Sequence, residues 1–252
     1  MRVVSLLPSA TDLLYAIGAG HTLVGRSAFC DAPTLPMVND EASLNAINPD
    51  VVLAACDCSL APTATGATVV SFNPTSIFDV FDDCLRLGEA VGCEAAADRV
   101  MVGLRSRYWS AVDFVNPYVP GPRILMLEWL SPLRVAGLWT PLLIEAAGGI
   151  PILNEPDQAS TVVTDEEVIA AAPDRIIVSP CGCALDSIQT LAGPVTEKPW
   201  WNTVDLVDGQ STFSRPGPRL VDAFEWLVSS INNRPRLMPR GFPVRTLSKD
   251  SL

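Results

Sequence analysis

The chain contains the same structural pattern twice, once in each half. In the first half an apolar segment begins at Arg2, and a proline–aspartate pair at Pro49, 47 residues later, precedes a second apolar segment. In the second half the arginine is Arg123, and the proline–aspartate pair begins at Pro173, 50 residues later. Both intervals contain a helical pattern that ends at glycine, the usual residue after a helix. Two similar α/β lobes are therefore expected, with a cleft between them that could hold a ligand.

Strands and helices alternate along both halves. Short apolar segments rich in valine, isoleucine and leucine are typical of buried strands, and the segments between them have the spacing of helices. This alternation predicts parallel sheets with helices on both faces. The fold class is therefore α/β, with two Rossmann-like three-layer lobes and mainly parallel sheets. In such sheets ligands bind beyond the carboxyl ends of the strands.

The segment between the halves predicts a long, rigid connecting helix. A capping-box pattern at Ser76 begins a helical stretch that is broken or kinked around Gly88 and Gly92, and prolines end it near residue 117. A helix of about 20 residues spans about 30 Å, enough to join two lobes. The expected organisation is an N-terminal lobe over 1–75, connecting helices over 76–117, a C-terminal lobe over 118–232 and a disordered tail over 233–252.

Three further helix starts have candidate capping residues. Ser9 or Thr11 can cap the helix that follows the first strand, and Ser43 can cap a short helix from residue 44. A capped helix is expected to begin at Thr164 and to run to Ala172.

Composition excludes two classes of partner. The formal charge is −11 and the chain has two lysines, Lys198 and Lys249, whereas a nucleic-acid surface needs clustered cations. The chain is 48% hydrophobic, but no segment has the roughly 20 uninterrupted apolar residues that a membrane-spanning helix needs. Neither nucleic-acid binding nor a membrane span is expected.

The N-terminus and the cysteines predict a cytoplasmic location. Met1 and Arg2 run directly into the first strand without the pattern of a signal peptide. Seven cysteines is an odd number, and their spacing matches no small disulfide scaffold, which fits a reducing compartment.

Several motifs resemble one family of binding proteins. Residues 4–11 (Val-Ser-Leu-Leu-Pro-Ser-Ala-Thr) and 44–53 (Leu-Asn-Ala-Ile-Asn-Pro-Asp-Val-Val-Leu), with the long connecting helix, resemble the substrate-binding proteins for vitamin B12 and iron-siderophores. The cobalamin-binding-protein-like branch looks closest, through residues 127–132 (Leu-Glu-Trp-Leu-Ser-Pro), 135–137 (Val-Ala-Gly), 180–182 (Pro-Cys-Gly) and 213–219 (Phe-Ser-Arg-Pro-Gly-Pro-Arg). The resemblance implies two lobes joined by one long helix, a shallow cleft for a metal chelate and no chemistry on the ligand. It also implies an ABC transporter permease as the partner of exported members, and we expect a monomer.

Aromatic side chains are the first candidates for ligand contact. A corrin ring is large, flat and edged with amides, so its site needs aromatic or aliphatic walls and a few hydrogen-bonding groups. Five aromatic residues fall on predicted strand-end loops: Phe29, Phe72, Trp129, Trp139 and Phe213. Trp129 is the strongest candidate among them. Alternatively, they cover the ends of the sheets. Pro8 and Ser9, in the loop after the first strand, are further candidates for ligand contact.

Charged candidates are fewer. Asp31 and Glu128 are predicted on the cleft side, where a carboxylate can accept hydrogen bonds from ligand amides or assist a metal. Arg215 lies before the last helix and can contact an amide or carboxylate edge of a ligand. For Asp31 and Glu128, a solvated or N-capping role is the alternative. His21 is the only histidine, so a histidine-rich metal site is excluded.

Five cysteines also fall on loops at predicted strand ends: Cys30, Cys56, Cys58, Cys181 and Cys183. Thiolates there can bind a soft or borderline metal, or the metal centre of a chelate. They can instead form a redox couple, or be small semi-buried residues that bind no ligand.

Two functions follow from these residues. The first is non-catalytic binding of a corrinoid such as cobalamin, or a related metal chelate, in the cleft between the lobes. The alternative is an intracellular metal-handling protein, or a thiol-dependent enzyme or regulatory protein, that uses the cysteines on the same fold.

Overall fold

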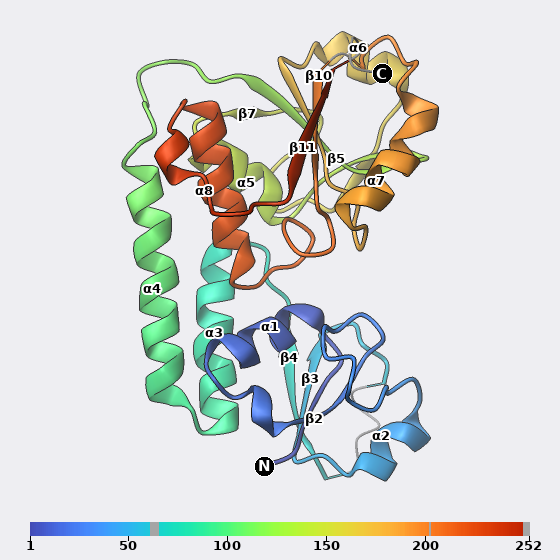
Figure 1. The fold of residues 1–252 in the computed structure, drawn as a ribbon, viewed down its shortest axis with the longest axis vertical. Helices are drawn as coiled ribbons and strands as arrows, with labels where there is room; N and C mark the ends of the chain where they lie inside the picture. Colours follow the sequence, from blue (N-terminus) through green and yellow to red (C-terminus); the bar gives the residue numbers. More distant parts are fainter. Residues whose placement is uncertain (61–65, 202, 249–252) are drawn as a thin grey trace. The chain divides into compact units, whose positions relative to one another are not determined.

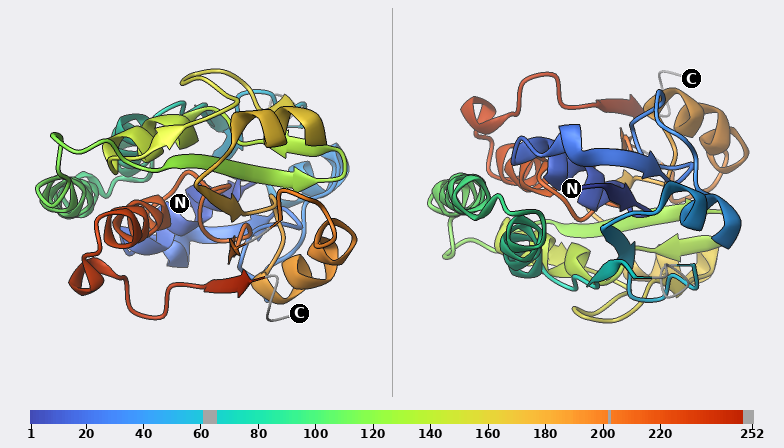
Figure 2. Two further views of the ribbon diagram at one scale, coloured as in Figure 1. Left: turned by 90° about the horizontal axis from the view of Figure 1, so that it is seen from above. Right: turned by 90° about the horizontal axis from the view of Figure 1, so that it is seen from below.

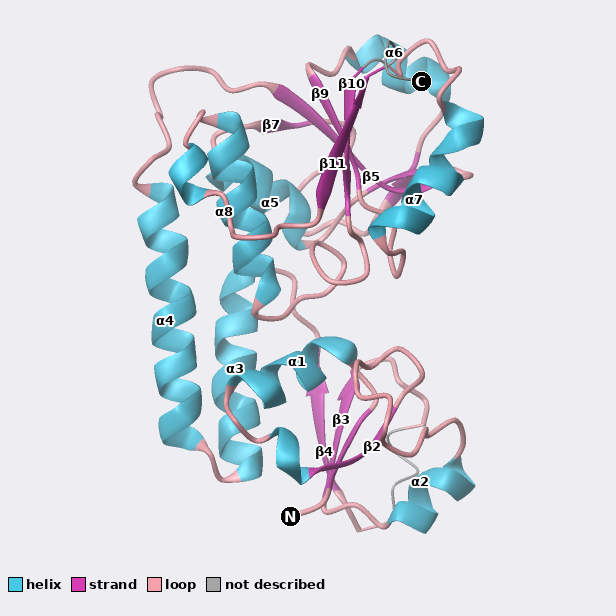
Figure 3. Ribbon diagram, in the orientation of Figure 1, coloured by secondary structure: helices cyan, strands magenta, loops and turns pink. Residues whose placement is uncertain are grey.

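The computed structural model describes residues 1–60, 66–201 and 203–248, and they form two compact units (Figure 1). The first unit comprises residues 1–74 and 78–106, and the second comprises 75–77 and 107–252. Helices and strands alternate in each unit (Figure 3), which confirms the predicted α/β class. The predicted connecting segment is shared between the units and does not form a separate body.

The sheet of the first unit is entirely parallel. Its order is β2-β1-β3-β4, from β1 (Val3–Ser5), β2 (Leu23–Arg26), β3 (Val51–Ala55) and β4 (Thr68–Phe72). Alternating side chains enter two different cores, because successive residues of a strand point to opposite faces. Val3 and Val51 pack in one core with residues of α1 (Pro8–Ala16), and Val4 and Val52 pack in another with Leu44 of α2 (Glu41–Ile47). The unit therefore has three layers.

Two helices occupy the predicted connecting segment. They are α3 (Ile77–Val91) and α4 (Glu94–Val112), and the turn between them places Gly92 at φ +69°. At Gly88 an added Cβ would lie 2.3 Å from the Cβ of Ala97, so the two helices can approach closely only with glycine there. The 19-residue α4 continues from the first unit into the second.

The sheet of the second unit is mixed. It consists of β5 (Arg123–Leu130), β6 (Leu133–Val135), β7 (Ile150–Pro151), β8 (Thr161–Val162), β9 (Arg175–Val178), β10 (Thr203–Val207) and β11 (Val244–Ser248). Its main order is β11-β10-β9-β5-β6-β8, and β7 also pairs with β5. The central pairs β5–β7, β5–β9 and β9–β10 are parallel, whereas β5–β6, β6–β8 and β10–β11 are antiparallel.

Helices cover both faces of this second sheet. Figure 2 shows α8 (Arg219–Ile231) on one side of the strands and α6 (Asp165–Ala171) with α7 (Leu185–Ala192) on the other. The α5 helix (Trp139–Ala146) lies beside α8 (Figure 1). On the α6 and α7 face, Val168 and Ile188 pack against strand residues such as Leu125 in one core. The described residues also contain short 3-10 helices: η1 (Gly20–Thr22), η3 (Gly193–Val195) and η4 (Pro235–Leu237).

The sequence repeat corresponds to a repeated hydrogen-bonding arrangement, which we call the arginine clasp. In the first unit the Arg2 guanidinium Nη2 donates to the Ile47 carbonyl at 2.7 Å, and its backbone N–H donates to the Asp50 carboxylate at 2.6 Å. In the second unit Arg123 makes the same two bonds, to Ala171 at 2.9 Å and to Asp174 at 2.8 Å. Each clasp fixes the end of a helix to the start of two strands.

The helix caps differ in part from those expected. Thr164 caps α6, as predicted, and forms a capping box with Glu167. The α2 helix is capped by Asp40, and Ser43 is the third residue of the helix, so its predicted role as the cap was wrong. Ser9 and Thr11 lie inside α1, which begins at Pro8 and has no side-chain cap. Proline at the first position has no N–H that needs a partner, so α1 can begin there.

The predicted disordered tail is wrong for its described part. Residues 244–248 form β11, which pairs antiparallel along all of β10. Leu247 joins the core on the α6 and α7 face, and the Thr246 hydroxyl donates to the Asp205 carboxylate at 2.6 Å. The strand forms because it supplies partners for the backbone groups of β10, which would otherwise be the sheet edge.

Candidate functional site

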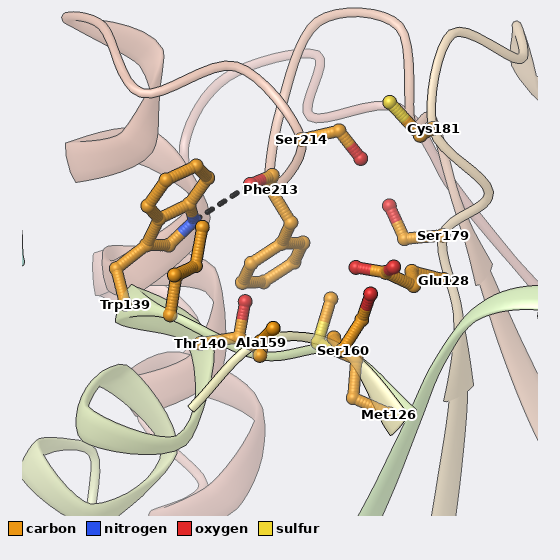
Figure 4. Close-up of a pocket in the computed structure, with 13 residues that line it drawn as sticks. Met126, Glu128, Trp139, Thr140, Ala159, Ser160, Ser179, Cys181, Phe213 and Ser214 are labelled. Carbon is orange, nitrogen blue, oxygen red and sulfur yellow. Dashed lines mark hydrogen bonds between the residues drawn. The ribbon is translucent and has the colours of Figure 1, made fainter. Parts of the chain in front are cut away.

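A pocket of about 260 Å³ lies within the second unit. It is bounded by β5, the residues after β9, the start of α5 and the loop after β10 (Figure 4). Its apolar lining includes Met126, Ala136, Leu138, Trp139 and Phe213. Its polar side chains are Glu128, Thr140, Ser160, Ser179, Cys181 and Ser214. An aromatic and aliphatic wall with a few polar groups is the usual composition of a small-molecule site.

Two aromatic side chains form the apolar wall. The indole Nε1 of Trp139 donates a hydrogen bond to the backbone carbonyl of Phe213 at 2.8 Å, and Figure 4 shows this bond beside the pocket. The Phe213 ring is only 3% exposed and packs edge-on against Trp226, with 6.0 Å between ring centroids. The start of α5 and the loop after β10 are therefore held together by the residues that line the pocket.

The backbone at the start of α5 is tightly constrained. At Gly137 an added Cβ would lie 2.4 Å from the carbonyl oxygen of Gln158, so only glycine fits this approach. The next residue, Leu138, has φ +53°, and its N–H donates to the same Gln158 carbonyl at 2.7 Å. These contacts fix the position from which Trp139 and Thr140 reach the pocket.

The polar wall contains a buried hydroxyl without a protein partner. Ser179 follows β9 directly, and its backbone N–H donates to the Leu127 carbonyl of β5 at 2.8 Å. The residue is 1% exposed, and its Oγ has no hydrogen-bond partner among the described residues. In Figure 4 this oxygen faces the same space as the hydroxyls of Ser160 and Ser214. A buried hydroxyl without a partner is costly, which is the expected condition of a group that bonds a ligand.

Glu128 supplies the one carboxylate that lines the pocket in the described part of the chain. It lies where the pairing of β5 with β6 shifts register between Leu127 and Trp129. Burial raises the pKa of Glu128, and a hydrogen bond with Ser160 and the charge of Arg134 oppose that rise. Arg134 also donates to the Ser160 carbonyl at 3.4 Å.

The structure brings some predicted site residues together. Glu128, Trp139, Phe213 and Cys181 line this pocket. Trp129 instead lines a separate cavity of about 260 Å³ near Pro180 and Leu191, and its indole N–H donates to the Ser131 carbonyl at 2.9 Å. Arg215 is 6% exposed and does not line the pocket. Ligand contact by Trp129 and Arg215 remains a prediction.

The remaining predicted ligand contacts belong to the first unit. Phe29 is 77% exposed and Asp31 is also exposed, whereas Phe72 is 3% exposed and Ser9 is buried at the start of α1 beside Pro8. Phe72 and Ser9 are thus in the interior of their unit. Roles for these five residues in ligand contact remain predictions.

The loop cysteines have different surroundings. All are free thiols. Cys30 is buried and donates from its Sγ to the Ser5 carbonyl at 3.4 Å, Cys58 and Cys183 pack partly against cores, and Cys56 and Cys181 are exposed. Within the described ranges, no group of three or more histidine, cysteine, aspartate or glutamate side chains is placed to hold a metal ion. Thiolate binding of a metal therefore gains no support.

Sequence reasoning missed most of the polar wall. Ser160, Ser179, Ser214 and Thr140 were not among the candidates, although Ser179 stands directly after a predicted strand, where ligands bind in α/β folds. Serine is so frequent in loops that the residue type alone gives no signal. The position after the strand was the signal available.

Comparison with known proteins identifies the family. A family model described as "Periplasmic binding protein" matches residues 3–205. An uncharacterized ABC transporter substrate-binding lipoprotein of Bacillus subtilis, YvrC, is 26% identical over 91% of this chain and 79% of its own length. The vitamin B12-binding protein of Photorhabdus laumondii is 24% identical over 92% of this chain and 88% of its own length. A crystal structure of a periplasmic heme-binding protein from Pseudomonas aeruginosa has a TM-score of 0.78 at 18% identity, and the alignment covers 98% of this chain and 95% of that chain.

These relatives bear on the predicted location and on the alternative function. They are named as lipoprotein, periplasmic or binding proteins, so the predicted cytoplasmic location and the alternative of a thiol-dependent enzyme gain no support from them. The ligands in their names are vitamin B12 and heme. Neither ligand is a siderophore, so a siderophore ligand gains no support from these relatives. No helix among the described residues is long and apolar enough to cross a membrane. Because the family model matches most of its length, this chain belongs to the periplasmic binding protein family.

Proposed function

We propose that this protein binds a corrinoid, or a related tetrapyrrole-type metal chelate, without converting it. The observation that carries the proposal is the pocket that combines the Trp139 and Phe213 wall with the unpartnered hydroxyl of Ser179. A flat macrocycle offers an apolar face to aromatic rings and polar side groups to hydroxyls. The pocket, of about 260 Å³, lies below the usual range of whole-ligand sites, so it suits one edge of such a ligand.

The relatives support the same class of ligand. One is named as a vitamin B12-binding protein and another as a heme-binding protein. Both ligands are metal chelates of a large flat ring. We propose this shared class of ligand, a metal chelate of a large flat ring, for the present chain.

Spectroscopic titration tests the proposal. The purified protein is titrated with cyanocobalamin and, separately, with hemin, while the visible absorption of the ligand is recorded. We expect saturable binding of at least one of them. Absence of binding by both would overturn the proposal.

A pair of variants at Trp139 tests the location. Trp139→Ala removes both the aromatic wall and the hydrogen bond to Phe213, and we expect affinity to fall about tenfold or more. Trp139→Phe is the matched control, because it keeps a ring and loses only the hydrogen bond. Equal affinity of the alanine variant and the unchanged protein would place the ligand elsewhere.

The proposed role continues with delivery to a membrane transporter. Support comes from the family and from YvrC, which is named as an ABC transporter substrate-binding lipoprotein. The test is stimulation of ATP hydrolysis by a reconstituted transporter from the same organism, with and without cyanocobalamin. A transporter that gains no activity from the loaded protein would contradict this role.

A further inference from the structure

The polar wall of the pocket carries a carboxyl group and no cationic side chain among the lining residues. Among the described residues that line it, Glu128 is the only charged side chain, and no lysine, arginine or histidine reaches the surface of the cavity. The other polar groups are the hydroxyls of Ser160, Ser179, Ser214 and Thr140 and the thiol of Cys181. A ligand edge entering here meets hydroxyls that can donate or accept hydrogen bonds and one carboxyl group, and no cation among the lining residues.

The cation whose charge acts on Glu128 is Arg134, and it is already engaged by Ser160. Arg134 lies on β6, and its Nη1 donates to the Ser160 carbonyl at 3.4 Å and lies 3.5 Å from the Ser160 hydroxyl. It is absent from the residues that line the cavity. Arg134 therefore offsets the charge of Glu128 from one side and does not offer a bidentate partner to a ligand carboxylate.

The Ser179 hydroxyl indicates independently that this wall bonds a group of the ligand. Its hydroxyl is buried, lines the cavity and has no protein partner in the described part of the chain. Figure 4 shows it between Ser214 and Glu128, with the three sets of oxygen atoms facing a common space. A single group with both a donor and an acceptor can bond this hydroxyl and the neighbouring carboxyl together, and a carboxamide has both.

We infer that the wall formed by Glu128 and Ser179 selects a ligand edge with neutral carboxamides over one with carboxylates. The inference rests on the proposed function and concerns which chelates the same pocket accepts. A carboxamide N–H can donate to the Glu128 carboxylate, whereas a ligand carboxylate would meet a like charge in a partly buried place. Corrinoids carry carboxamides around the ring and hemes carry propionates, so corrinoids are the favoured class.

Burial of Glu128 strengthens this selection. Because water is partly excluded, a charge brought next to the carboxylate is screened less than it would be at the surface. The same burial raises the pKa of Glu128, against the opposing effects of Ser160 and Arg134. A neutral donor adds no charge and supplies a further hydrogen bond to the carboxyl group, beside the one from Ser160.

The test compares two ligands that differ in one group. Binding of cobalamin is measured against a cobalamin derivative in which one ring carboxamide has been hydrolysed to a carboxylate, for each position of hydrolysis that can be isolated. The unchanged protein should bind cobalamin about tenfold or more tightly than at least one such derivative. This comparison needs no variant, so misfolding cannot affect it.

Variants then assign the preference to the wall. Glu128→Gln should reduce the preference severalfold, because the like charge is gone and an amide donor faces the ligand carboxylate. Glu155→Gln is the matched control, since it makes the same change at an exposed carboxylate outside the pocket, and it should leave the preference unchanged.

The outcomes separate the inference from the proposed function. Cobalamin binding with no preference over any derivative, or with the same preference after Glu128→Gln, would overturn the inference and leave the proposed function standing. Tight binding of hemin and none of cobalamin would do the same. Absence of binding by both cobalamin and hemin would overturn the proposed function, and the inference with it.

Discussion

At the scale of single residues, Asp83 is an ionisable group held in an unfavourable environment. The residue is 6% exposed on α3, and its carboxylate pairs with the Arg86 guanidinium at 2.9 Å. Burial raises the pKa of Asp83 from 3.8 to about 6, Arg86 lowers it in part, and the charges of Asp79 and Asp82 raise it further. The folded state therefore binds a proton here more strongly than the unfolded chain does.

This proton binding predicts a dependence of stability on pH. Because the folded pKa is the higher one, the favourable contribution is complete below about pH 4 and is lost as the pH rises through about 6. Relative to Asp83→Asn, the free energy of unfolding of the unchanged protein should fall by at most about 3 kcal/mol between those values. Urea unfolding of both proteins across this range measures it.

The neighbouring carboxylate supplies the control for Asp83. Asp82 is exposed on the same helix, so Asp82→Asn should not reproduce the effect. A constant difference in stability between the unchanged protein and Asp83→Asn at every pH would show that burial does not govern this carboxyl group.

Single residues also show what the sequence could not predict. Phe72 and Phe213 were placed on strand-end loops, and they lie at the end of β4 and in the loop after β10, yet each is 3% exposed. A strand end in a three-layer fold can still be covered by helices and loops, so its position along the chain does not determine the direction of a side chain. Exposure of Phe29 and burial of Phe72 follow from tertiary packing that periodicity does not describe.

At the scale of elements, the capping box of α6 offers a direct measurement. The Thr164 hydroxyl accepts from the Glu167 N–H at 3.2 Å, and the Glu167 carboxylate accepts from the Thr164 N–H at 2.7 Å. Thr164→Ala should lower the free energy of unfolding by about 1 kcal/mol, measured by urea denaturation. Thr190→Ala, at an exposed position of α7, is the control and should lower it little. Equal losses would indicate that the cap contributes nothing.

The strand β11 gives a second prediction at this scale. Leu247 is 9% exposed within a core, so Leu247→Asp should lower the free energy of unfolding by about 3 kcal/mol or more. Met238→Asp is the matched control, because Met238 is 42% exposed in the same C-terminal segment. Thermal unfolding of both variants measures the difference. If the two tolerated the charge equally, β11 would not be part of the folded core.

Elements differ in how well the sequence predicts them. The cap at Thr164 was predicted because the pattern of a helix start is local. The cap of α2 was assigned to Ser43 because Asp40 and Ser43 both suit that role, and only the path of the backbone decides between them. β11 was missed because a five-residue strand at a sheet edge is specified by its partner β10, which lies far from it in sequence.

At the scale of the whole molecule, the internal repeat explains why the fold could be predicted and the pocket only in part. Each copy specifies its strands and helices through short local patterns, so both lobes follow from the sequence. The pocket joins β5 and the loops after β7, β9 and β10, whose order in space depends on how the second sheet pairs. Glu128, Trp139, Phe213 and Cys181 were predicted for a cleft between the lobes, and a pocket within the second unit that they line together was not predicted.

The repeat leads to a last prediction, about the two arginine clasps. Asp50 and Asp174 each accept the backbone N–H of an arginine that begins a strand. Asp50→Ala and Asp174→Ala should each lower the free energy of unfolding by about 1 kcal/mol, since each leaves that N–H without its acceptor. The two clasps share no residue and belong to different units, so the double variant should lose the sum of the two, within about 0.5 kcal/mol. Urea denaturation of the four proteins completes the cycle, and a coupling energy above about 1 kcal/mol would mean that the two copies of the repeat do not stabilise the molecule independently.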